Sequence, residues 1–216
     1  MRLPASRRAK APAMTTPAAT SDIERAVFVL RSGGLVAFPT DTLYALGADA
    51  ARAAAVDRVF AVKGREAGKA LPLFVDGLEM AGAVCILNDA ARRLAASFWP
   101  GALTLVLPRR PEFESLALGG GGTAALRVPA HATALALVAG LGGPVTGTSA
   151  NRSGGPEPAT AAEVRRQLGE AVDYVLDGGP CLVGRPSTVV DCSGDDVRVL
   201  RQGAIAEESI RRALAA

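Results

Sequence analysis

The sequence contains few of the residues that usually signal metal or nucleophilic chemistry. It has one histidine, His131, so a Ser-His-Asp set has no second candidate base, and a lone histidine is more often a cap or a surface residue than a catalyst. The cysteines Cys85, Cys181 and Cys192 show no C-x-x-C spacing. This argues against a zinc site and a disulfide scaffold, and it favours a reducing, cytoplasmic location.

Aromatic residues and long apolar runs are also scarce. Aromatics make up only 4% of the chain, so the core must be built from Ala, Val and Leu. No apolar run reaches about 18 residues, so we expect no membrane association. Neither a Rossmann glycine fingerprint nor a P-loop is present. The four glycines Gly119 to Gly122 follow no expected strand and open no helix, so we predict a mobile loop over Pro108–Gly122.

Acidic residues are absent from the first 20 positions, although these positions carry four cations. Without them, 20 basic residues face 21 acidic residues, so the body of the chain is close to neutral. The segment is rich in Ala, Pro and Thr and lacks hydrophobic periodicity. We predict that residues 1–20 form a disordered basic tail and that residues 21–216 form a single domain.

Apolar segments of strand and helix character alternate along the body. Helices are expected from a Ser21-x-x-Glu24 capping box to Gly33, and over 49–62, 77–98 in two parts, 132–139, 160–168 and 206–214. Strands are expected over 35–38, 71–75, 103–107, 124–128, 144–146, 174–176, 187–191 and 197–201. This order predicts a single-domain, three-layer α/β fold with a twisted mixed sheet.

The stretch GLVAFPTDTLYALG, from Gly34 to Gly47, is the first candidate for a site. A buried strand ends at Pro39, and Thr40, Asp41, Thr42 and Tyr44 follow directly. Small hydroxyls and a carboxylate at the carboxyl end of a strand are typical of a ligand site in an α/β sheet. The alternative is a turn in which Thr and Asp only cap backbone groups.

Other polar residues gather at strand ends and in loops. The cations are Lys63, Arg65, Lys69, Arg127 and Arg201, and the hydroxyls and amides are Thr40, Thr42, Thr148, Ser149, Asn151, Ser153, Ser187 and Thr188. This set has no obvious nucleophile or general base, but it suits the binding and neutralisation of a polyphosphate. Each cation taken alone is more often a solvated surface charge.

Seven motifs in order give the chain a family resemblance. They are PTDTLYALG, KGREAGKALPL, WPGALTLVLP, LRVPAH, TSANRSG, STVVD and LRQGAI, and they cover about Ile23 to Ile205. The chain resembles the YrdC family of threonylcarbamoyl-AMP synthases in its short form. The pairing of K-x-R (Lys63, Arg65) with S-x-N (Ser149, Asn151) resembles the tetrad of the active synthases.

The resemblance implies a YrdC-like fold and a nucleotidyl transfer that uses ATP, Mg²⁺, bicarbonate and L-threonine. The product, threonylcarbamoyl-AMP, would pass to threonylcarbamoyl-transfer enzymes that modify tRNA. Lys63 and Arg65 are implied as catalytic residues, and no residue is assigned to a metal. The residues implied for threonine are Thr40, Arg127, Ser149 and Ser187. Those implied for ATP are Lys63, Arg65, Lys69, Thr123, Asn151 and Arg201.

Departures from the family pattern qualify two of these contacts. Phe74 stands nearest to a family histidine that touches threonine, and Ala159 stands at the register of a family threonine, with Thr160 next to it as a substitute. Two other functions fit the resemblance. A YrdC-like protein that binds double-stranded RNA without synthase activity is one, but the near-neutral body opposes it. An accessory carbamoyl-transfer domain of a larger hydrogenase-maturation protein is the other, although partner domains are absent from this sequence.

Overall fold

The computed structural model describes residues 18–66 and 68–215. The helices are Thr20–Arg31 (α1), Ala53–Lys63 (α2), Leu78–Val84 (α3), Asp89–Phe98 (α4), Ala132–Leu141 (α5), Ala161–Leu168 (α6) and Glu207–Ala215 (α7). The strands are Val36–Phe38 (β1), Ala45–Gly47 (β2), Leu73–Phe74 (β3), Leu103–Pro108 (β4), Thr123–Arg127 (β5), Val145–Thr146 (β6), Thr148–Ser149 (β7), Tyr174–Val175 (β8), Thr188–Asp191 (β9) and Arg198–Arg201 (β10). Two short 3₁₀ turns cover Leu116–Leu118 (η1) and Gly169–Ala171 (η2).

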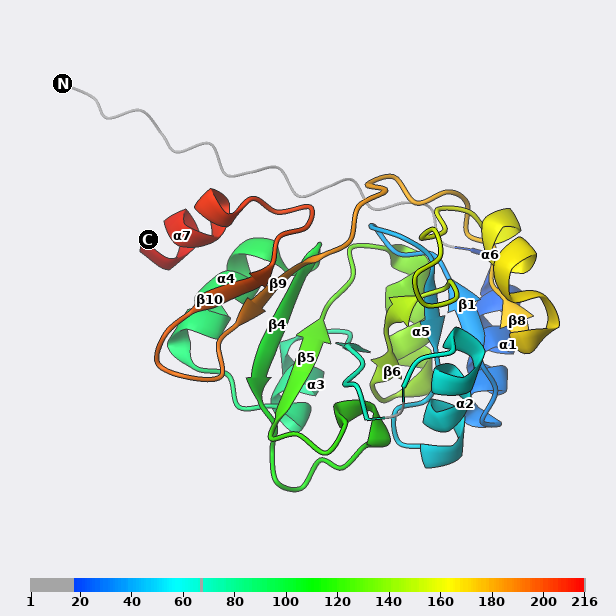
Figure 1. Cartoon of the computed structure of the whole chain (residues 1–216), viewed down its shortest axis with the longest axis horizontal. Helices are drawn as coiled ribbons and strands as arrows, with labels where there is room; N and C mark the ends of the chain where they lie inside the picture. The colour runs from blue at the N-terminus through cyan, green and yellow to red at the C-terminus, as the bar shows by residue number, and fades with distance from the viewer. Residues whose placement is uncertain (1–17, 67, 216) are drawn as a thin grey trace.

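The strands form two mixed sheets that lie beside each other (Figure 1). The smaller has the order β7-β2-β1-β8 and the larger has the order β10-β9-β4-β5-β3-β6. Parallel pairs (β1 with β8, β3 with β5, β4 with β9) occur among antiparallel ones. A bridge between Asp49 and Val145 connects the end of β2 to β6. The α/β class with mixed pairing is thus confirmed, and the strands are divided between two sheets.

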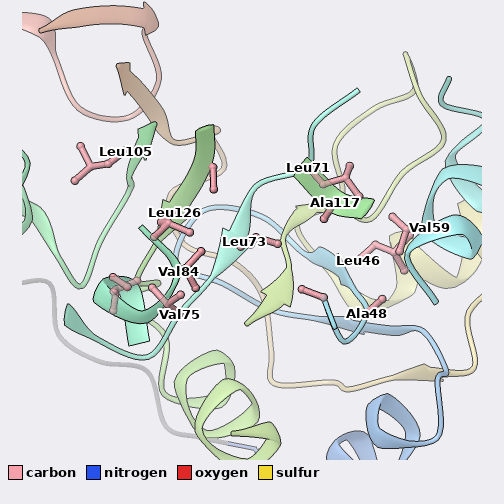
Figure 2. Packing of buried hydrophobic residues seen from close by; sticks show 14 of the residues in the cluster. Leu46, Ala48, Val59, Leu71, Leu73, Val75, Val84, Leu105, Ala117 and Leu126 are labelled. Atoms are coloured by element: carbon pink, nitrogen blue, oxygen red, sulfur yellow. The ribbon is translucent and has the colours of Figure 1, made fainter. Parts of the chain in front are cut away.

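One hydrophobic core runs beneath both sheets (Figure 2). Leu46 of β2 belongs to the same buried cluster as Leu73 of β3 and Leu126 of β5. As expected from the composition, Leu, Val and Ala make up most of this cluster. A second cluster, between α1, α5 and β1, contains Phe38 and Phe74, whose rings meet edge to face with centroids 5.8 Å apart. Because residues of both sheets pack in one core, a pocket between the sheets lies against a tightly packed interior.

Local sequence signals predict most helix ends correctly. Asn88 accepts a hydrogen bond from Ala91 N at the start of α4, and Thr160 with Glu163 forms the capping box of α6. Gly64 ends α2 in the left-handed conformation (φ 60°), as expected for a C-cap glycine. The box expected at Ser21 is wrong, because α1 begins at Thr20 and the N-cap position is occupied by Ala19, two residues before Ser21.

Two regions differ from the expectation for reasons of tertiary structure. Strands β2 and β7 were not predicted, and they lie in segments read as a turn and a polar loop. Strand β2 is held by pairing with β1 and β7, and β7 by pairing with β2. Part of the loop over residues 108–122 packs regularly, contrary to the expectation. Its 3₁₀ turn η1 buries Ala117 and Leu118 in the core, and Ala117 O accepts a hydrogen bond from Leu71 N at 2.7 Å. Of the predicted tail, residues 1–17 lie outside the described residues, and Thr20 already belongs to α1.

Candidate active site

A pocket of about 280 Å³ lies where the connection between β1 and β2 faces both sheets. Its polar lining comes from eight separate segments of the chain. The lining includes Thr40, Thr42, Tyr44, Arg65, Thr104, Arg127, Thr148, Ser149, Glu157, Ser187 and Arg201. All four residues that the resemblance assigns to threonine are among them, as are Arg65 and Arg201 of the ATP set. Lys63, Lys69, Thr123 and Asn151 are not among the lining residues.

Arg127 is a buried cation at the end of β5, with 5% of its surface exposed. Nε donates to Gly101 O (2.9 Å), Nη1 to Thr42 Oγ1 (2.9 Å) and Nη2 to Asp41 Oδ1 (2.6 Å). Burial lowers the pKa of Arg127, and the adjacent Asp41 carboxylate opposes that shift. A guanidinium carries five N–H groups, so one on each Nη has no acceptor among the described residues. These two donors suit a carboxylate ligand.

Thr40 organises the turn after β1. Its hydroxyl donates to Leu43 O (2.7 Å) and accepts from the backbone N–H groups of Thr42 (3.1 Å) and Leu43 (3.2 Å). Because its only proton is directed at Leu43 O, the 2.9 Å contact between Thr40 Oγ1 and Thr42 Oγ1 has Thr42 as donor. Thr40 therefore has no free hydrogen-bonding capacity. Thr40 thus caps backbone groups of the turn, as one reading of this stretch expected, while other residues of the stretch line the pocket.

A second polar group lines the pocket. Ser187 Oγ lies 2.8 Å from Thr104 Oγ1, and Arg201 Nη2 donates to Ser187 O (2.9 Å). Ser187 precedes β9 and Arg201 ends β10, which pairs with β9. This places the Arg201 cation beside a pair of hydroxyls that can each donate or accept.

Lys63 and the S-x-N segment form a buried network. Lys63 Nζ donates to Ser149 O (2.5 Å), Asn151 O (2.9 Å) and Asn151 Oδ1 (3.2 Å), and Ser149 Oγ donates to Asn151 Oδ1 (2.6 Å). Burial, with Arg65 nearby, lowers the pKa of Lys63 to about 8. All three ammonium donors are thus used to shape the segment that presents Ser149 to the pocket.

The remaining predicted cations are less constrained. Arg65 Nη2 donates to Ala70 O (3.0 Å), but its buried Nε has no partner among the described residues. Lys69 forms an exposed ion pair with Glu66 (3.2 Å). Thr123 begins β5, four residues before Arg127, and pairs with Pro108 at the other end of the strand.

Sequence reasoning singled out Tyr44 without giving it a role, and it missed two polar lining residues, Thr104 and Glu157. Tyr44 is fully buried, and its OH donates to Gly179 O (2.8 Å). Burial beside Asp177 raises the pKa of Tyr44, which keeps the phenol neutral. Its place in the PTDTLYALG motif was a usable signal. Thr104 lies inside the apolar run LTLVL, where a polar residue is the only clue, and Glu157 gave no signal in the sequence.

Phe74 and His131 have structural positions. Phe74 lines the pocket, and the Arg127 guanidinium carbon lies 5.7 Å from its ring centroid. His131 occupies the N-cap position of α5 without forming a side-chain cap, is 1% exposed, and has no partner for either ring nitrogen among the described residues. Burial lowers the pKa of His131, so the ring is neutral. It is not a surface residue, and it does not line the pocket.

Within residues 18–66 and 68–215, no group of three or more His, Cys, Asp or Glu side chains is placed to hold a metal ion. In the same part of the chain no helix is long and apolar enough to cross a membrane.

Comparison with known proteins identifies the family of the chain. The Sua5/YciO/YrdC family model, described as "Telomere recombination", matches residues 28–203. The chain is 38% identical over 201 residues to the threonylcarbamoyl-AMP synthase of Bacillus subtilis, covering 91% of this chain and 58% of that protein. It is 40% identical over 163 residues to the enzyme of the same name from Thiobacillus denitrificans, covering 75% and 86%.

A solved structure shares the fold closely. The crystal structure of Pyrococcus abyssi Sua5 complexed with L-threonine superposes with a TM-score of 0.88 at 36% identity, covering 93% of this chain and 59% of that one. The chain thus spans less than two thirds of the Bacillus and Pyrococcus proteins. With a family match over most of its length and relatives near 40% identity, the chain belongs to the Sua5/YciO/YrdC family.

Proposed function

We propose that the protein is an L-threonylcarbamoyladenylate synthase. One observation carries the proposal: Thr40, Arg127, Ser149 and Ser187, which are far apart in the sequence, meet in one pocket with the cations Arg65 and Arg201. A pocket with a buried guanidinium and further cations can hold an amino-acid carboxylate and a polyphosphate together. The names of two relatives and the threonine complex of a third support this reading.

In the proposed reaction the substrates supply the nucleophiles. The threonine amine attacks the carbon derived from bicarbonate, a C–N bond forms, and water leaves to give a carbamate. A carbamate oxygen then attacks the α-phosphorus of ATP, and the bond to the β-phosphate oxygen breaks. The products are threonylcarbamoyl-AMP and pyrophosphate. This chemistry needs orientation and charge stabilisation more than a protein nucleophile, which agrees with the residues present.

The residues divide between the two substrates. Arg127 would bind the threonine carboxylate with its two remaining N–H groups, while Thr40 would act through Thr42 rather than by direct contact. Ser149 and Ser187 would offer hydroxyls to the rest of the amino acid. Arg65, Arg201 and Lys69 would meet the phosphates.

The other residues expected to bind ATP have indirect or distant positions. Lys63 and Asn151 would hold Ser149 in place, because their hydrogen bonds are made within the network. Thr123 begins β5 and does not line the pocket, so an ATP contact there requires a nucleotide that extends along the strand.

Mg²⁺ would enter with ATP, where it would neutralise phosphate charge. The donor set fits this use, because magnesium in nucleotide sites is usually held by one or two carboxylates together with substrate phosphates and water. Glu157 is the carboxylate among the residues that line the pocket. A resident metal site is not part of the proposal.

The product is a reactive mixed anhydride, so it would pass to a threonylcarbamoyl-transfer enzyme that acts on tRNA. Direct contact with tRNA and a cytoplasmic location are parts of the same proposal. Arg127, Thr104 and Ser187 are buried in a small pocket, which suits small substrates better than the RNA duplex of the alternative function.

The test is pyrophosphate release from ATP, Mg²⁺ and bicarbonate, with and without L-threonine. We expect release to require both threonine and bicarbonate and to be lost in Ser149→Ala and Arg127→Ala. Arg92→Ala removes an exposed cation on α4, away from the pocket, and should leave the rate unchanged. Release that does not depend on threonine, from protein that is folded by circular dichroism, would contradict the proposal.

A further inference from the structure

Asp41 is the carboxylate that faces Arg127, and it receives two hydrogen bonds on a single oxygen. Oδ1 accepts from Arg127 Nη2 (2.6 Å) and from Ala130 N (3.0 Å). The side chains of the pair are 6% and 9% exposed, so both charges are almost entirely removed from water. Removal of either partner would leave the other as an uncompensated buried charge.

The contacts of Arg127 fix the direction of its guanidinium. Gly101 O and Asp41 Oδ1 accept from Nε and Nη2, and Thr42 Oγ1 accepts from Nη1. The Thr42 hydroxyl donates to Thr40 Oγ1, and the Thr40 hydroxyl donates to Leu43 O. Thr42 therefore cannot direct its hydroxyl proton at Arg127 without loss of a hydrogen bond within the turn. Asp41 is the charged member of this set. It therefore decides whether the remaining N–H groups of Arg127 stay directed at the pocket.

The backbone of the same turn has a separate task. Asp41 O accepts from Val183 N (3.2 Å) and Thr42 O accepts from Gly184 N (3.1 Å). These bonds tie residues 177–186, a strap that joins β8 to β9 across the molecule (Figure 1), to the turn. A change of the Asp41 side chain leaves these backbone bonds in place, so the hydrogen bonds that it removes are those from Arg127 and Ala130.

We propose that Asp41 is a positioning residue that makes the pocket selective for the carboxylate of its amino-acid substrate. It acts through Arg127 and does not touch the substrate. The inference rests on the proposed function for the identity of the amino acid. The ion pair itself does not depend on that identity, because any α-amino acid that enters the pocket presents a carboxylate.

The test compares the binding of L-threonine and L-threoninamide, which lacks the negative charge, by calorimetry on the full chain. The wild-type protein should prefer threonine. In Asp41→Ala this preference should fall by about tenfold or more, since close buried charge pairs couple by more than about 1.5 kcal/mol. Asp41→Asn keeps an oxygen that can accept both hydrogen bonds and should fall between the two. ATP affinity should change much less than threonine affinity in both variants.

Asp173 provides a matched control. It also accepts hydrogen bonds from an arginine and from a backbone N–H, with Arg58 Nη2 at 2.8 Å and Leu35 N at 2.6 Å, and it is not among the residues that line the pocket. Asp173→Ala should leave the preference for threonine over threoninamide unchanged. If Asp41→Ala does not fold, Asp41→Asn carries the test.

Three results would overturn the inference. They are an unchanged preference in the Asp41 variants, tighter threonine binding by Asp41→Asn through the freed Arg127 charge, and an equal loss of ATP and threonine affinity. Failure of the proposed function gives a different result. In that case threonine-dependent pyrophosphate release is absent from the wild-type protein, whether or not the pocket prefers carboxylate ligands.

Discussion

The region around Arg127 and the loop around Arg65 place similar cations at one pocket, but the protein organises them to different degrees. Arg127 is held by three acceptors and is nearly inaccessible to water. Arg65 donates to one carbonyl in its own loop and leaves Nε without a partner among the described residues. An arginine that is already oriented binds its ligand with little further ordering, whereas one in a sparsely bonded loop becomes ordered when the ligand arrives.

This difference has a physical cause in the surroundings of each residue. Arg127 ends a central strand of the larger sheet, with β3 and β4 on either side. Arg65 follows the C-cap of α2, and its loop rests against η1 through a close approach of backbones. A Cβ at Gly119 would lie 2.1 Å from Gly68 O, so only glycine fits there. The comparison predicts a preformed amino-acid site and a polyphosphate site completed by ATP.

Arg127→Lys is the variant expected to have the largest effect on the difference between the Arg127 region and the Arg65 loop. An ammonium cannot serve Gly101 O, Thr42 and Asp41 in the fork geometry of a guanidinium. Loss of a buried, hydrogen-bonded charge contact costs about 2–5 kcal/mol, so threonine affinity should fall by about 30-fold or more. Calorimetric titration with threonine and with ATP measures the effect. Equal losses for the two ligands would show that the Arg127 region is not specific for the amino acid.

Arg65→Ala should have the next largest effect, on ATP. A charge-assisted hydrogen bond contributes about 1.5–3 kcal/mol, so ATP affinity should decrease by about tenfold or more while threonine affinity is retained. Lys69→Ala is the comparison in the same loop. Its exposed pair with Glu66 contributes little, and a more mobile ammonium should give a smaller loss. A larger loss for Lys69 than for Arg65 would reverse the assignment.

The pH dependence of Lys63 sharpens the comparison. Its pKa is lowered from 10.5 to about 8, so above about pH 8 the folded protein loses a proton and one of three donors to residues 149–151. Activity from this network should therefore fall as pH rises through 8. Lys63→Arg stays charged and should lack that decrease, and the ratio of the two rates cancels titration of the substrate amine. A ratio that does not vary with pH would contradict the role of Lys63.

The lowered pKa of Lys63 has the opposite effect on stability: activity should fall with pH, whereas stability should rise. Below about pH 8 Lys63 is protonated in the folded and unfolded states alike, and between 8 and 10.5 only the unfolded state keeps the proton. The contribution of Lys63 to the free energy of unfolding therefore increases with pH in that window. Urea unfolding of the wild-type protein and Lys63→Arg across this window separates the two effects.

The smallest effect is expected for Thr160→Ala at the start of α6. Thr160 Oγ1 accepts from Glu163 N, and loss of an N-cap hydroxyl costs about 1 kcal/mol of unfolding free energy. Affinity for both substrates should be retained, because the hydroxyl is used within the helix. Thr160→Asn should restore stability. A loss of ATP affinity in Thr160→Ala would instead indicate that Thr160 contacts the nucleotide. It would then replace the family threonine whose register Ala159 occupies.

The sequence predicted the features that depend on local chemistry. The caps at Asn88 and Thr160 and the C-cap at Gly64 follow from hydrogen bonds within a few residues, so the pattern was sufficient. The capping box predicted at Ser21 was wrong because α1 begins before Ser21, so this residue is not the N-cap. Strands β2 and β7 are two or three residues long and exist through pairing with neighbouring strands, which periodicity does not reveal.

The sequence predicted which residues line the pocket better than it predicted what each side chain does there. The family resemblance supplied Arg127, Ser149 and Ser187, and the structure brings them together. The hydrogen-bonding capacity of Thr40 and the use of all Lys63 donors depend on which atoms face each other in three dimensions. Thr104 escaped notice for a related reason, because one polar residue in a buried strand acquires meaning only from its neighbour Ser187.

The solitary imidazole of His131 has a practical consequence. A chain with one histidine gives one set of imidazole proton resonances, and here the ring is buried close enough to Asp41 for the carboxylate to influence its protonation. We therefore expect the chemical shift of these resonances to respond to changes at Asp41, without an introduced label. Titration with threonine, followed through this signal, observes the carboxylate side of the pocket while the phosphate side remains empty.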